Sequence, residues 1–104
     1  MGLVVDIYGF TSTLPPEERF GLISQMRRAA VSVPSNIAEG CARTSKKERL
    51  QFLSIAIGSL SELDTLLDLA NRLGYGARAE ELNQTVDRVS GLTMGLSASL
   101  RRSV

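Results

Sequence analysis

Polar residues recur at helical spacing within the stretch QMRRAAVSVPSNIAEGCAR, residues 25–43. This polar ridge has members three or four positions apart: Gln25, Arg28, Ser32, Asn36, Glu39 and Arg43. A helix places residues with these spacings on one face. Such a ridge can fix the register of helices through hydrogen bonds and ion pairs, contact a ligand or nucleic acid, or simply face solvent.

A second set of small and polar residues follows at the same kind of spacing: Ser54, Gly58, Glu62 and Thr65. A glycine inside a helix costs about 1 kcal/mol relative to alanine, so we expect another element to pack close to Gly58. We predict that the two ridges face each other or a neighbouring subunit, with Arg28 paired to Glu39 or Glu62. The predicted structural and interface network comprises Gln25, Arg28, Asn36, Glu39, Gly58 and Glu62.

Charge is unevenly distributed, although the formal net charge is only +1. Residues 27–49 hold six basic side chains against Glu39 and Glu48, a local charge of +4. Residues 62–87 hold six acidic side chains against Arg72 and Arg78, a local charge of −4. The candidate nucleic-acid-binding residues are Arg27, Arg43, Lys46, Lys47 and Arg49. They could contact phosphates, or they could be ordinary solvated charges.

The residue types that catalysis and metal binding use most are scarce. The chain has no histidine and a single cysteine, Cys41, so it excludes histidine-based general bases and nucleophile pairs within one chain. With no tryptophan and 5% aromatic residues, it also lacks a motif for stacking on bases. We therefore predict no catalytic residues, no metal site and no cofactor.

Hydrophobic periodicity predicts the elements that carry these residues. Apolar side chains recur at spacings of three and four through three long segments, and no comparable segment alternates with period two. Pro15-Pro16 before two glutamates, and Ser45 three positions before Glu48, are typical helix starts. The glycines at 40 and 74 are expected helix stops. The predicted helices cover about residues 3–11, 16–40, 46–73 and 77–102.

The resulting prediction is a single all-α domain over residues 1–104, an up-and-down antiparallel four-helix bundle with a shortened first helix. The first helix has only about two turns before residues 11–15 end it. Such a helix cannot cover the full length of its partners, so apolar surface should stay open and favour self-association.

Two segments resemble a known family. The segments QMRRAAVSVPSNIAEG (residues 25–40) and RTSKKE…FLSIAIGSLSELDTLLDLANRLGY (residues 43–75) are similar to bacterial four-helix bundle proteins encoded in intervening sequences of large-subunit ribosomal RNA genes. The resemblance implies an up-and-down bundle that commonly forms a ring-like homopentamer. It extends to the accessory protein of diversity-generating retroelements, a bundle oligomer that binds nucleic acid and a reverse transcriptase. From the resemblance we expect that the first half of the family's helix one is missing before Gly2.

These observations predict a non-enzymatic, oligomeric scaffold, with nonspecific binding of RNA or DNA through the basic residues as the alternative. The expected partners are further copies of the chain, RNA or DNA, or another protein. The uncharged run 50–61 is shorter than the ~20 residues that a membrane-spanning helix needs. No signal peptide is evident, so we expect no membrane association and a cytoplasmic location.

Overall fold

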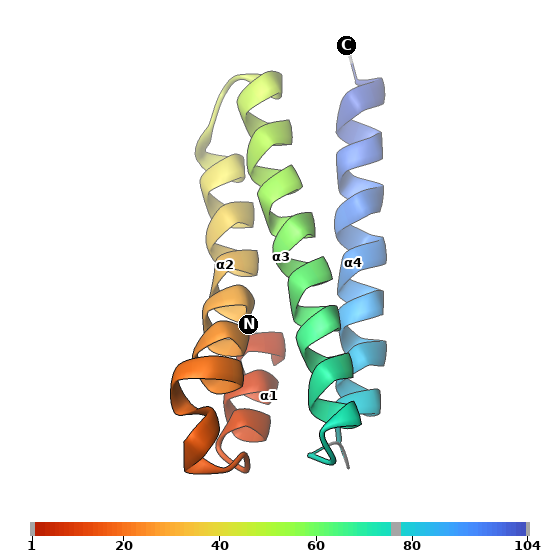
Figure 1. Cartoon of the computed structure of the whole chain (residues 1–104). Coiled ribbons are helices and arrows are strands. Elements are labelled where there is room, and N and C mark those ends of the chain that lie inside the picture. The colour runs from red at the N-terminus through yellow and green to blue at the C-terminus, as the bar shows by residue number, and fades with distance from the viewer. Residues whose placement is uncertain (1, 76–77, 104) are drawn as a thin grey trace.

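The computed structural model describes residues 2–75 and 78–103, which fold as an all-α bundle. Its α-helices are α1 (Gly2–Thr11), α2 (Ser24–Ala42), α3 (Lys46–Arg72) and α4 (Ala79–Arg102). The long helices α2, α3 and α4 run side by side in alternating directions, and the short α1 lies at one end of them (Figure 1). No strand occurs within the described residues. The predicted four-helix bundle with a shortened first helix is confirmed.

The boundaries of α3 follow from its capping residues. The Ser45 hydroxyl accepts a hydrogen bond of 3.3 Å from the backbone N–H of Glu48, which satisfies one of the unpaired donors at the helix start. At the other end, Gly74 adopts a φ of +87°, a left-handed conformation that costs glycine no steric penalty. The start predicted for the fourth helix, residue 77, lies outside the described residues, and α4 is described from Ala79 onward.

The segment predicted as one helix over residues 16–40 is interrupted. A 3₁₀ turn, η1 (Pro16–Glu18), and a π-helical turn, η2 (Arg19–Ile23), precede α2. The break lies at Gly21, whose φ of −107° and ψ of −105° are not helical. Pro34 lies inside α2. The expected stop at Gly40 is wrong, because α2 continues to Ala42. A Cβ at Gly40 would lie 3.2 Å from the Cβ of Phe52, so this glycine allows α2 and α3 to approach closely.

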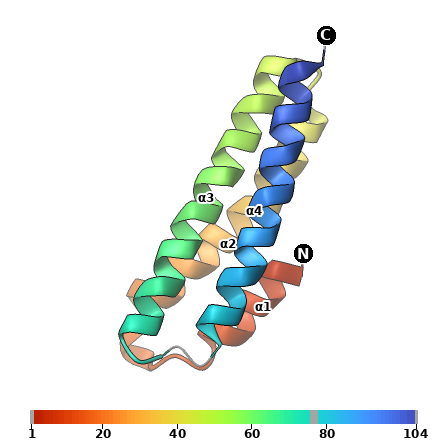
Figure 2. The same ribbon diagram turned by 90° about the vertical axis from the view of Figure 1, so that its right-hand side faces the viewer.

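The core is concentrated in the half of the bundle that contains α1. The apolar residues that recur at spacings of three and four along α3 form its seam, and all of them are buried: Leu53, Ala56, Leu60, Leu63, Leu67 and Ala70. In α4 the apolar residues of the first half, such as Leu82 and Val86, are buried, whereas Leu96 in the second half is 49% exposed. The difference arises because α1 lies alongside only the first half of α4 (Figure 2).

Two interactions hold α1 against α2. The Arg27 side chain donates a 2.8 Å hydrogen bond from Nε to the hydroxyl of Thr11, which is fully buried. The Arg27 guanidinium carbon also lies 4.5 Å from the centroid of the Tyr8 ring, a cation–π distance. Arg27 therefore tethers the first helix to the bundle.

Among the described helices, α3 has the length and composition that would allow it to cross a membrane. In the fold α3 is the central helix and packs against both α2 and α4. Within the bundle, 33% of the most apolar 18-residue window of α3 is buried.

Candidate functional site

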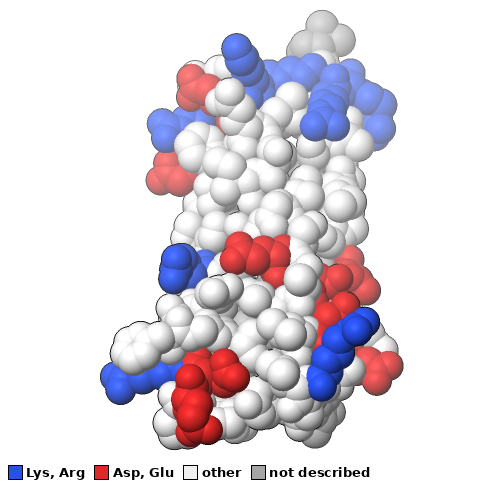
Figure 3. Space-filling model, in the orientation of Figure 1, with Lys and Arg blue, Asp and Glu red and all other residues white. Residues whose placement is uncertain are grey.

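Basic side chains gather at the end of the bundle that lies away from α1. The end of α2, the start of α3 and the end of α4 meet there (Figure 1), and Figure 3 shows Lys and Arg side chains clustered on it. We call this group the basic end: Arg43, Lys46, Lys47, Arg49, Arg101 and Arg102. Lys46 Nζ donates a 2.9 Å hydrogen bond to the carbonyl oxygen of Arg101, which joins α3 to α4 at this point.

The structure separates one candidate nucleic-acid-binding residue from the others. Arg27 contacts α1, in the opposite half of the bundle, whereas Arg43, Lys46, Lys47 and Arg49 lie together. Arg43 forms an ion pair of 3.0 Å with Glu39 and lies 4.9 Å from the Phe52 ring centroid.

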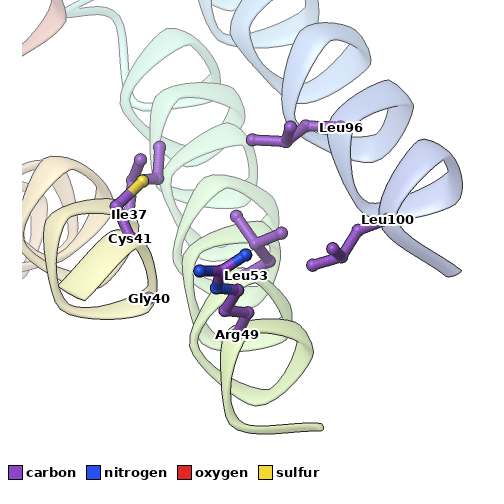
Figure 4. A pocket seen from close by; sticks show the side chains of 7 residues that line it. All are labelled: Ile37, Gly40, Cys41, Arg49, Leu53, Leu96 and Leu100. Carbon is purple, nitrogen blue, oxygen red and sulfur yellow. The ribbon is translucent and has the colours of Figure 1, made fainter. Parts of the chain in front are cut away.

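An apolar slot opens beside the basic end. It is a cavity of about 240 Å³ lined by Ile37, Gly40 and Cys41 from α2, Arg49 and Leu53 from α3, and Leu96 and Leu100 from α4. Figure 4 shows Leu96 and Leu100 reaching toward Ile37 and Cys41 across Leu53. We call this cavity the open slot. Its lining comes from α2, α3 and α4. The helix α1 does not reach this end of the bundle (Figure 2).

Arg49 supplies the polar group at the edge of the open slot. Its Nε donates a 2.7 Å hydrogen bond to the carbonyl oxygen of Arg43, so the side chain is fixed against the loop between α2 and α3. Cys41 is exposed on the α2 side of the same cavity. The slot therefore combines apolar walls with a positively charged rim, a combination suited to an apolar group that has acidic neighbours.

In the middle of the polar ridge, Ser32 joins α2 to α3. The hydroxyl of Ser32 accepts hydrogen bonds from Asn36 Nδ2 at 2.9 Å and from the Ser59 hydroxyl at 2.8 Å. Asn36 Nδ2 also donates to the Ser32 carbonyl oxygen at 2.8 Å. The network predicted from the sequence included Gly58 but not Ser59. The signal for Ser59 is its place three positions after the buried Ala56, at the edge of the hydrophobic seam.

The rest of the predicted network faces outward. Gln25, Arg28, Glu39, Gly58 and Glu62 are exposed. Within the described chain Arg28 does not pair with Glu39 or Glu62. Its nearest polar partner is the Ser24 hydroxyl at 3.4 Å, while Glu39 pairs with Arg43. No atom lies within 4 Å of a Cβ built on Gly58, so the close packing expected there does not occur within one chain. Glu39 pairs with Arg43 because residues four positions apart are neighbours on the surface of a helix.

A comparison with protein families decides the identity of the chain. The family model described as "23S rRNA-intervening sequence protein" matches residues 1–98. The chain belongs to this family. The resemblance inferred from the NIAEG-containing segment is thereby confirmed. None of the curated proteins compared with the chain matches it.

The description of the 23S rRNA-intervening sequence protein family refers to ribosomal RNA and names no reaction. Within the described residues of this family member, no group of three or more Cys, Asp or Glu side chains is placed so that it could hold a metal ion. One titratable group is clearly perturbed. Partial burial raises the pKa of Tyr75, and the nearby Glu18 carboxylate, 3.4 Å from the Tyr75 hydroxyl, raises it further. This contact lies far from the basic end and ties η1 to the end of α3.

Proposed function

We propose that this chain is a non-enzymatic, cytoplasmic assembly protein whose copies associate and present a shared surface to RNA, DNA or a protein partner. The open slot carries this proposal, because it leaves apolar side chains in water that a second molecule could cover. Leu92 is 72% exposed and Leu96 is 49% exposed on the same helix. Contiguous apolar surface of this kind usually marks an interface. The family resemblance suggests five subunits.

Three features support a role in assembly over catalysis. The chain has no histidine, and the charged residues around the slot form local pairs such as Arg43 with Glu39. The slot itself has apolar walls and no acid–base pair among the residues that line it.

Size-exclusion chromatography with light scattering tests the proposal. At micromolar concentration we expect the wild-type chain to elute as an oligomer. The Leu96→Asp variant should elute as a smaller species with unchanged helical circular dichroism, because a carboxylate in the slot would be costly to bury. Leu69→Asp is the matched control: Leu69 is 44% exposed on α3, away from the slot, and its replacement should leave the mass unchanged. A monomeric wild-type chain would overturn the proposal.

Nonspecific binding of nucleic acid is the second candidate, and the basic end favours it. Lys47 and Arg102 come from separate helices, are both exposed, and lie at the same end of the bundle. An oligomer would repeat this cluster, and repeated phosphate contacts raise the total affinity.

A charge-reversal pair tests this candidate. Lys47→Glu combined with Arg102→Glu should weaken binding to a mixed-sequence single-stranded RNA, and binding by the wild-type chain should fall steeply between low and physiological salt. Arg72→Glu combined with Arg88→Glu gives the same change of net charge at exposed positions distant from the basic end. Equal effects of the two pairs, or affinity independent of salt, would exclude a phosphate contact at the basic end.

A further inference from the structure

Two acidic side chains lie close to the basic end, and both are beside Arg43. The Nη2 atom of Arg43 is 3.0 Å from the Glu39 carboxylate, and its Nε is 3.8 Å from the Glu48 carboxylate. Arg49 belongs to the same side of the basic end, because its Nε donates to the Arg43 carbonyl oxygen. This side therefore holds two basic and two acidic side chains, and its net charge is zero.

The other side of the basic end lies where α3 begins and α4 ends. Lys46 Nζ donates hydrogen bonds to the carbonyl oxygens of Arg101 and Ser103, which holds the last turn of α4 beside the first turn of α3. The helix α4 has no acidic residue after Asp87. In Figure 3 the Asp and Glu side chains near this end lie over α2, whereas only Lys and Arg are visible there over α3 and α4. We call this positively charged group the α3–α4 corner: Lys46, Lys47, Arg101 and Arg102, all exposed.

A surface hollow adjoins the α3–α4 corner. It has a volume of about 600 Å³ and is lined by Lys46, Lys47, Leu50, Gln51 and Ser54, all from α3. Four of these five side chains carry hydrogen-bond donors, and none is acidic. Two of the donors are ammonium groups, which form their strongest hydrogen bonds with negatively charged oxygens. The hollow is therefore suited to an anionic group with several acceptor oxygens, such as a phosphate.

The fold itself creates this concentration of charge. Lys46 and Arg101 are 55 positions apart in the sequence, and packing of α3 against α4 brings them together. Like charges held close together repel one another, and an anion bound between them relieves the repulsion. On the opposite side of the basic end, Glu39 and Glu48 already provide the negative charge.

We propose that the α3–α4 corner and its hollow form a binding site for the phosphodiester backbone of a nucleic acid, with Lys47, Arg101 and Arg102 as the contacting cations. The inference rests on the nucleic-acid binding proposed above and specifies its site. It assigns no phosphate contact to the side of the basic end that Glu39 and Glu48 neutralise. Because the contacts are to phosphate, RNA and DNA should both bind.

Two identical substitutions at different places test the hollow. Gln51→Glu puts a carboxylate among the donors and should weaken binding to a fluorescein-labelled single-stranded RNA of mixed sequence several-fold at low salt. Gln25→Glu is the matched control, because it makes the same change at an exposed position near the start of α2, in the half of the bundle that contains α1. It should have a much smaller effect. Fluorescence anisotropy measures both affinities, and single-stranded DNA of the same sequence should respond in the same way.

Charge removal on the two sides of the basic end provides a second test. Arg101→Gln should lower the slope of log affinity against log salt by about 0.7, the value for one phosphate contact on a single strand. The double variant Glu39→Gln with Arg43→Gln removes an ion pair from the other side at constant net charge, and its slope should equal that of the wild-type chain. Circular dichroism checks the helical fold of every variant.

The outcomes separate this site from nucleic-acid binding in general. A lower slope in the double variant with an unchanged slope in Arg101→Gln would overturn the site and leave nucleic-acid binding intact. Equal effects of Gln51→Glu and Gln25→Glu would do the same. Weakening that is confined to RNA would overturn the phosphate contact, because it would indicate recognition of the 2′-hydroxyl. A wild-type chain that binds neither RNA nor DNA at low salt would overturn both proposals.

Discussion

The hydroxyl of Ser59 on α3 donates a 2.8 Å hydrogen bond to the hydroxyl of Ser32 on α2. The same Ser32 oxygen accepts from Asn36, so three polar side chains form a connected group between two helices whose other contacts are largely apolar. A hydrogen bond of fixed geometry allows one register of the two helices and disfavours others. The group therefore defines how α2 and α3 align, beyond what their hydrophobic seams require.

Ser32→Ala tests the contribution of this group. The substitution removes the oxygen that accepts both hydrogen bonds, and we expect the free energy of unfolding to fall by about 1 kcal/mol, since a net hydrogen bond contributes roughly that much. Urea unfolding at a fixed protein concentration measures it. Ser54→Ala, at an exposed position of α3, is the control and should change the value by less than about 0.5 kcal/mol. Equal effects of the two substitutions would contradict the role of the group.

Gly58→Ala should stabilise the subunit. Gly58 lies inside α3, and a Cβ there would meet no atom within 4 Å, so alanine would gain about 0.8–1.0 kcal/mol of helix propensity without a clash. Thermal unfolding monitored by circular dichroism measures the change. Gly40→Ala is the contrasting variant and should destabilise, because its Cβ would press against the Cβ of Phe52 at 3.2 Å. A loss of stability or of oligomer mass in Gly58→Ala would instead place this glycine against a neighbouring subunit.

Tyr75 makes stability depend on pH in the alkaline range. Its pKa is raised above the ordinary value of about 10 by partial burial and by the Glu18 carboxylate. The folded chain therefore keeps the phenol proton at a pH where the unfolded chain loses it. The stabilisation is fully present below about pH 10 and is lost as pH rises through the raised pKa.

Replacement of either partner should reduce this alkaline loss of stability. We expect the free energy of unfolding of Tyr75→Phe to fall less steeply above about pH 10 than that of the wild-type chain, measured by urea unfolding at several pH values. Glu18→Gln removes the carboxylate that raises the pKa and should flatten the profile in the same direction. Identical slopes in all three proteins would show that this contact is absent in solution.

The helices and their buried faces could be predicted from the sequence because both depend on local periodicity. Spacings of three and four selected the α3 seam, including Leu60 and Leu67, and all of it is buried. Ser45, three positions before Glu48, marked the start of α3 for a similar reason, since a capping hydroxyl acts within one turn. The shortness of the first helix was also evident, because turn-forming residues follow it directly.

Only the tertiary structure decided which polar and apolar groups meet. Leu96 continues the apolar spacing of α4, yet it is 49% exposed, because α1 lies beside only the first half of α4 (Figure 2). Arg27 belongs to the basic segment 27–49 of the sequence, but packing places it against Tyr8 and Thr11 instead of at the basic end. The physical reason is the same in both cases. Periodicity fixes the face of a helix on which a residue lies, whereas its exposure and partners depend on what the neighbouring helices place opposite it.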